Sequence, residues 1–212
     1  ASFGFTSANE ATGNTSASTI QKPRLWSAMA AYTNGPLQLG IGYERHLDYN
    51  AAAQANYTGG NDSMYTLGAG YTFMGSLKLS GVYNSINYGL AAGQEMSVKT
   101  WGVYADWAVS GPHRVRLGYG VQGSTKGSYN GMTATANTQI GSWTGNAGAG
   151  QTGAQKIHGE YAYALSKRTE LGLAYAKTNN DRFANQTVGT GANTPAYGES
   201  QTFMGMLIRH KF

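Results

Sequence analysis

The sequence predicts an all-β protein: a transmembrane, antiparallel up-and-down β-barrel that forms a single domain over residues 1–212. Three observations predict this fold. Apolar and polar residues alternate with a period of two along about ten segments of the chain. Most of these segments are about ten residues long, which is the length of a strand that crosses a bilayer at a tilt. Short turns alternate with long polar connections, as they do in barrels of the bacterial outer membrane.

The alternation is clearest in residues 156–165 and 114–122. In the first segment, the odd positions hold Ile157, Gly159, Tyr161, Tyr163 and Leu165, and the even positions hold Lys156, His158, Glu160, Ala162 and Ala164. The second segment repeats the pattern, with Arg114 and Arg116 on its polar side. Successive side chains of a strand point to opposite faces. Each segment is therefore a strand with one apolar and one polar face.

The same pattern defines ten candidate strands in order along the chain: residues 2–7, 25–32, 37–47, 64–73, 77–88, 98–109, 114–123, 155–165, 170–178 and 201–212. Tight turns at residues 34–36, 74–76, 110–113 and 166–169 contain glycine, proline or serine, the residues that turns favour. The longer connections are residues 8–23, 48–63, 89–97, 124–152 and 179–200. Short turns at one end and long loops at the other favour a membrane barrel over a soluble sandwich.

The residue types predict which face of the strands meets lipid. Tyr32, Phe73 and Trp107 lie on the apolar face just before short turns, where outer-membrane barrels carry girdles of aromatic residues. A soluble β-sandwich would instead hide its apolar face in a core and keep charge outside. We therefore expect the apolar face to contact membrane lipid and the polar face to line a water-filled lumen.

Three segments resemble a known family. Residues 203–212, FMGMLIRHKF, resemble the last strand of Gram-negative outer-membrane proteins, whose terminal phenylalanine, here Phe212, is read by the barrel-insertion machinery. Residues 161–171, YAYALSKRTEL, closely resemble the turn before the penultimate strand of the general porins, especially those of β-proteobacteria. Residues 31–37, AYTNGPL, resemble another strand-turn-strand unit of that family.

The resemblance runs from residue 25 to residue 212 and implies a general porin of the bacterial outer membrane. Porins of this family have about sixteen antiparallel strands, assemble as homotrimers in lipid and fold a constriction loop into the lumen. Because ten candidate strands are present here, the resemblance implies that this chain is the C-terminal part of a porin barrel. Six strands and the constriction loop would then lie outside it. A complete ten-stranded barrel is the alternative.

The polar face predicts the function: a channel for passive diffusion of small hydrophilic solutes and ions. The candidate pore-lining residues are Arg114, Arg116, Lys78, Asp106, Glu44, His158, Glu160, Glu170, Arg209 and Lys211, and Lys156 and His46 share their face. The alternation thus puts six permanent cations against four carboxylates in the lumen. Fixed charges raise the local concentration of counter-ions in a wide pore, so this balance predicts a lean toward anions. Glu170 beside Arg209 or Lys211 has a second interpretation, as a cross-strand pair that is only structural.

Composition and motifs exclude several other classes. The chain has a net charge of +5, but its lysines and arginines are scattered, so no basic patch for a nucleic acid forms. No run of about 18 apolar residues predicts a membrane helix. The G-x-G-x-x-G string at residues 118–123 lies within a strand, and the phosphate-loop-like string at residues 145–152 lacks its lysine. We expect no nucleotide, no other cofactor and no metal site.

Two other functions stay open from the sequence alone. An outer-membrane hydrolase of the protease type would use Asp and His residues at the rim, and His46, Asp48, Asp62 and Asp181 are the candidates. Such rim charges are also ordinary in a channel, so we predict no enzyme activity. An adhesin-like barrel with a plugged lumen is the other alternative.

Overall fold

The computed structural model describes residues 2–9, 24–49, 60–89, 95–127, 150–189 and 193–211. These residues form one antiparallel sheet of eleven strands, and none of them is helical. The strands are β1 (Ser2–Asn9), β2 (Arg24–Asn34), β3 (Leu37–Tyr49), β4 (Gly60–Phe73), β5 (Leu77–Gly89), β6 (Glu95–Ser110), β7 (His113–Gln122), β8 (Lys126–Gly127), β9 (Ala154–Ala164), β10 (Thr169–Asn180) and β11 (Gln201–His210). The all-β prediction is confirmed.

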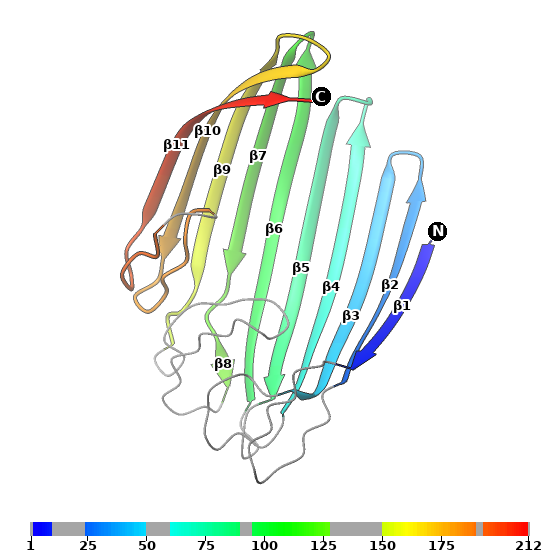
Figure 1. The fold of residues 1–212 in the computed structure, drawn as a ribbon, viewed down its shortest axis with the longest axis vertical. Coiled ribbons are helices and arrows are strands. Elements are labelled where there is room, and N and C mark those ends of the chain that lie inside the picture. The colour runs from blue at the N-terminus through cyan, green and yellow to red at the C-terminus, as the bar shows by residue number, and fades with distance from the viewer. Residues whose placement is uncertain are drawn as a thin grey trace.

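The ten long strands are paired in the order in which they occur in the sequence. Each of β1 to β7 pairs with the next, β7 pairs with β9, and β10 and β11 complete the sheet. The two-residue β8 pairs with β6, within a connection that the sequence predicts to be free of strands. Figure 1 shows the strands side by side in one curved sheet, with β1 and β11 at its two edges. Within the described residues these two edge strands are not paired with each other.

Four short turns lie together at one end of the sheet (Figure 1). Two of them place a glycine with positive φ before a proline: Gly35 (φ 53°) precedes Pro36, and Gly111 (φ 53°) precedes Pro112. Glycine adopts positive φ without steric cost, and proline fixes the next φ near −65°, which is the combination of a type II′ hairpin turn. The sequence places these turns correctly because their chemistry is local.

The two faces of the sheet differ as the alternation predicts. On the apolar face, large side chains such as Ile41, Leu117 and Leu173 are about half exposed, at 54%, 55% and 56%. Half-exposed apolar side chains across a whole sheet are what a lipid-facing barrel wall requires. We call the opposite side the polar face; it carries the even-numbered side chains of β3 to β7, β9 and β10 and the odd-numbered ones of β11.

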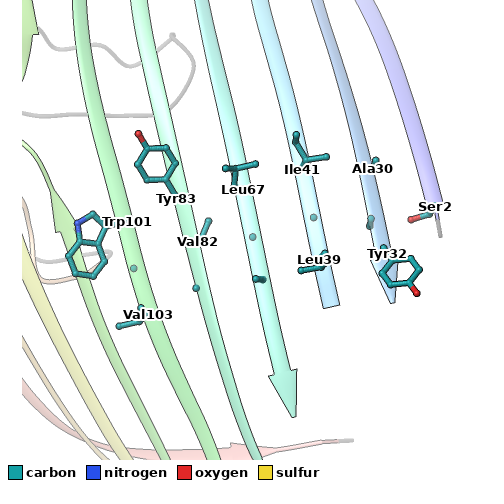
Figure 2. Close-up of a pocket in the computed structure, with 16 residues that line it drawn as sticks. Ser2, Ala30, Tyr32, Leu39, Ile41, Leu67, Val82, Tyr83, Trp101 and Val103 are labelled. Carbon is teal, nitrogen blue, oxygen red and sulfur yellow. The ribbon is translucent and has the colours of Figure 1, made fainter. Parts of the chain in front are cut away.

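Figure 2 shows part of the apolar face at close range. Side chains from β2 to β6, among them Leu39, Leu67 and Val103, surround a shallow hollow of about 850 Å³. The hollow arises where small residues, Ala69 and Gly81, lie opposite each other on β4 and β5. No charged side chain lines it, so it offers no chemistry for a polar solute.

Large apolar and aromatic residues also occur on the polar face, so the division of residue types between the two faces is not complete. Tyr104 lies there, and so does Phe203, although both are about half exposed. Nearer the other end of the strands, Ile86, Tyr88 and Met96 lie on the polar face and are buried. The part of the chain that the structure describes contains no helix long and apolar enough to cross a membrane.

Candidate functional site

The strand register gathers most of the predicted pore-lining residues into one belt across the polar face. Lys78 on β5 lies opposite Asp106 on β6, and Asp106 lies opposite Arg116 on β7. Arg116 lies opposite Glu160 on β9. Because each of these residues has the same orientation in its strand, their side chains project from one face in a row. We call this row, with the neighbouring Arg114, Glu170 and Arg209, the charged belt.

Arg114 and Asp106 form a two-pronged ion pair within the belt. The Arg114 Nε donates to one Asp106 carboxylate oxygen and its Nη2 donates to the other, each at 2.5 Å. Arg116 also approaches the Asp106 carboxylate, with its Nε 3.9 Å from Oδ1. The planar guanidinium matches a carboxylate in this geometry, so the pair is fixed in orientation as well as in charge.

The remaining belt residues form a four-membered cluster. Arg209 donates to both Glu160 oxygens at 2.6 and 2.8 Å and to Glu170 at 2.6 Å. The Arg116 Nη1 also donates to the Glu160 Oε1, and it lies 3.4 Å from the Glu170 Oε1. The Glu160 side chain is only 5% exposed, so the two guanidinium groups replace the water that would otherwise solvate it. The cluster holds β7, β9, β10 and β11 together across the sheet.

The cluster joins strands that are not adjacent in the sheet. Arg209 on β11 reaches across β10 to Glu160 on β9. Gly172 lies on the polar face of β10 between them, opposite Ala162 and Leu207. The predicted contact of Glu170 with Arg209 is confirmed, and the link to Glu160 is added to it.

Three lysines of the polar face, Lys78, Lys156 and Lys211, have no described carboxylate partner. Lys78 donates instead to the Gln38 Oε1 at 2.8 Å, and Lys156 is exposed. Within the belt, Asp106, Glu160 and Glu170 match the three arginines, so its net charge of plus one comes from Lys78. The positive excess of this face is thus carried by lysines, whereas the densest cations in the sequence are paired.

Other predicted residues lie away from the belt. His158 is exposed, next to Gly118 in register, and Lys211 follows the last residue of β11. Glu44 lies toward the far end of β3, where one carboxylate oxygen is 3.0 Å from the His46 Nε2. The structure therefore brings seven of the ten predicted residues together and separates His158, Lys211 and Glu44 from them.

Sequence reasoning missed the uncharged polar residues of the same face. Thr66 donates to the Asn84 Oδ1 at 2.8 Å, and the Asn84 amide donates to the Thr100 Oγ1 at 3.1 Å. These three side chains cross β4, β5 and β6 in one row. The alternation of the strands places these three residues on the polar face, but they are uncharged and so were not among the predicted pore-lining residues.

Tyr104 is a second residue that the sequence did not assign to this face. Its ring lies over two glycines: a Cβ at Gly102 would be 2.8 Å from the Tyr104 Oη, and one at Gly118 would be 3.1 Å from its Cδ1. The Tyr104 ring thus occupies space that side chains at these two positions would need.

The hydrolase candidates are divided between two distant parts of the sheet. His46 and Asp62 lie opposite each other on β3 and β4 and are buried, and the Asp62 carboxylate accepts a hydrogen bond from the Gly89 amide at 3.2 Å. Asp181 follows β10, which is five strands away from β4 in the sheet. The side chain of Asp48 lies outside the described residues, as do Phe212 and most of the phosphate-loop-like string. Among the described residues no group of three or more His, Asp or Glu side chains could hold a metal ion.

Comparisons with known proteins agree with this geometry. A sequence model of the family described as Gram-negative porin matches residues 1–182. Among solved structures, the chain is similar to the anion-selective porin from Comamonas acidovorans, with 26% sequence identity and a TM-score of 0.66 over 89% of this chain. The chain spans 49% of the length of that porin. A comparison with curated protein sequences finds no match. The chain belongs to the Gram-negative porin family and is a protein of the bacterial outer membrane.

Proposed function

We propose that this chain forms part of the wall of a water-filled channel through which small hydrophilic solutes and ions diffuse passively. The observation that carries the proposal is the division of one sheet into a half-exposed apolar face and a face that bears a continuous charged belt. A belt of this kind needs water on its open side, because its arginines are 26% to 46% exposed. A lumen supplies that water, and lipid faces the other side.

The charge of the polar face supports a lean toward anions. Within and next to the strands, this face carries six lysines and arginines against five carboxylates, because Asp62 joins the four predicted carboxylates. The anion-selective porin to which the chain is similar agrees with this direction. The excess is small, so the preference is modest, and the lysines Lys78, Lys156 and Lys211 carry it.

The described sheet is one section of a larger barrel in this proposal. Its two edge strands are unpaired with each other, and the chain spans about half of the similar porin. An open edge exposes unpaired backbone donors and acceptors, which lipid cannot satisfy. Further strands must therefore close the barrel, and we infer a single barrel domain whose C-terminal portion is residues 1–212. Family membership also supports a homotrimer as the assembled form.

Uptake of uncharged sugars by proteoliposomes tests the proposal. We expect liposomes that contain the purified porin to swell in isotonic arabinose, because an aqueous lumen admits a small polar solute without a binding site. Liposomes that contain a plugged adhesin-like barrel or a membrane hydrolase would stay impermeable to arabinose and would not swell. Absence of swelling with protein that is folded, as judged by heat-modifiable migration, would contradict a channel.

A further inference from the structure

The connection from β10 to β11 does not extend freely from the strand ends. Residues 183–188, which we call the fold-back segment, are held by side chains of three strands. The Asn180 amide donates to the Gln186 carbonyl at 3.0 Å, and its Oδ1 accepts from the Gln186 backbone N–H at 2.9 Å. The Gln186 side chain donates to the Gln122 Oε1 on β7 at 3.0 Å, and the Val188 N–H donates to the Gln201 Oε1 on β11 at 2.9 Å.

The anchoring side chains show on which face the fold-back segment lies. Gln122 has the orientation of Arg114 and Arg116 in β7, Asn180 that of Glu170 in β10, and Gln201 that of Arg209 in β11. All three residues therefore belong to the polar face. A segment bonded to all three must lie over that face, on the side of the charged belt.

Burial shows that the fold-back segment is packed against this wall. Ala184 within it is 0% exposed, and Thr178 beneath it on β10 is 1% exposed. The backbone continues this packing, because the Phe183 N–H donates to the Gln151 carbonyl and the Gly198 N–H donates to the Ala184 carbonyl. In Figure 1 part of the β10–β11 connection turns back along the strands, at the end of the sheet away from the short turns.

We propose that the fold-back segment is a fixed constriction at this end of the channel, and that it limits the size of the solutes that pass. The inference rests on the proposed channel function, because only a lumen on the polar face gives the segment something to narrow. Six residues held by several hydrogen bonds and buried at Ala184 occupy volume next to the wall permanently. Solutes that pass along the polar face must pass beside them.

Two variants remove the constriction to different extents. In N180A/Q186A the segment loses the two side chains that bind it to β10 and β7, and in a shortened variant two glycines replace residues 183–188. We expect the swelling rate of proteoliposomes in raffinose, relative to arabinose, to rise on the order of twofold in the shortened variant, because a wider pore admits the larger sugar. The N180A/Q186A variant should show a smaller rise.

The matched control is N179A/Q155A, which removes the same residue types from neighbouring positions. Gln155 accepts a hydrogen bond from Tyr119 on the apolar face, and Asn179 lies beside Asn180 with the opposite orientation. In N179A/Q155A the ratio of the swelling rate in raffinose to that in arabinose should equal the ratio of the parent protein. Parent protein that admits arabinose, with an unchanged ratio in both test variants, would overturn the constriction while leaving the channel intact. Parent protein that admits neither sugar would overturn the channel itself.

A variant that keeps every anchor covers the case in which the shortened protein does not fold. The chain has no cysteine, so R182C introduces a unique thiol beside the segment at an exposed position. Attachment of a bulky thiol reagent should lower the raffinose-to-arabinose ratio further. An unchanged ratio after complete modification would overturn the proposal.

Discussion

The double substitution R114Q/R116Q is expected to shift the channel's preference toward cations. It leaves Asp106, Glu160 and Glu170 with Arg209 and Lys78 as the remaining belt cations, so the net charge of the belt changes from plus one to minus one. Two charges about 10 Å from a passing ion change its energy by about 0.8 kcal/mol in water, roughly a fourfold change in local concentration before screening. The reversal potential of single channels in a KCl gradient measures this shift.

Ionic strength provides the internal control for that experiment. The Debye length falls from about 10 Å at 0.1 M to about 3 Å at 1 M, so the shift should be large in dilute salt and small in concentrated salt. The corresponding substitution K177Q removes a cation from β10 with the opposite orientation and should leave the reversal potential unchanged. If R114Q/R116Q leaves the reversal potential at 0.1 M unchanged, neither arginine acts on ions in the conduction pathway.

The substitution E160Q is expected to destabilise the protein and to move selectivity in the opposite direction. Glu160 accepts hydrogen bonds from both Arg116 and Arg209 and is 5% exposed, so a neutral amide leaves two guanidinium groups with Glu170 alone. Hydrogen bonds to charged groups contribute about 1.5 to 3 kcal/mol each. The partial exposure of the arginines reduces the net loss to about 2 kcal/mol. Equilibrium unfolding in urea, with the protein in detergent or in liposomes, measures this loss in the free energy of unfolding.

The neighbouring carboxylate provides the comparison. E170Q removes a more exposed group, 23% against 5%, and leaves both arginines bound to Glu160. Its loss of stability should be the smaller of the two. Both substitutions add one positive charge to the belt, so both should increase anion preference by similar amounts. Equal losses of stability in E170Q and E160Q would contradict the larger role that burial gives Glu160.

The strands, the turns and the identity of the charged residues could be predicted because they depend on local chemistry. A period of two fixes which face a side chain takes, and a Gly-Pro pair fixes a turn wherever it occurs. The contact between Glu170 and Arg209 followed from two adjacent strands joined in known order. The resemblance of residues 161–171 to the general porins also predicted the correct fold.

Contacts that depend on register over several strands could not be predicted. Arg114 reaches Asp106 through the pairing of β6 with β7, whose register shifts between Ala108 and Ser110. Arg209 reaches Glu160 across β10, between two strands that are not adjacent in the sheet, and the alternation within a single strand does not reveal such a contact. Tyr104 shares the face of Asp106 by alternation, but a search for charged residues leaves it out.

The fold-back segment is the clearest case of information absent from the local sequence. Residues 183–188 have no periodic pattern and were predicted only as part of a long polar connection. Their position is set by Gln122, which is 64 residues from Gln186, and by Gln201 on the last strand. Only the assembled sheet brings these side chains together.

The reversal potential of the unmodified porin in planar bilayers tests the central claim most directly. A water-filled lumen lined by the polar face should give stepwise, ohmic conductance with a modest anion preference at 0.1 M KCl, and the preference should weaken toward 1 M as screening increases. This result follows from one face that carries six cations against five carboxylates. Cation selectivity in dilute salt would contradict the assignment of the charged belt and its lysines to the lumen, and the absence of stepwise conductance would contradict the channel.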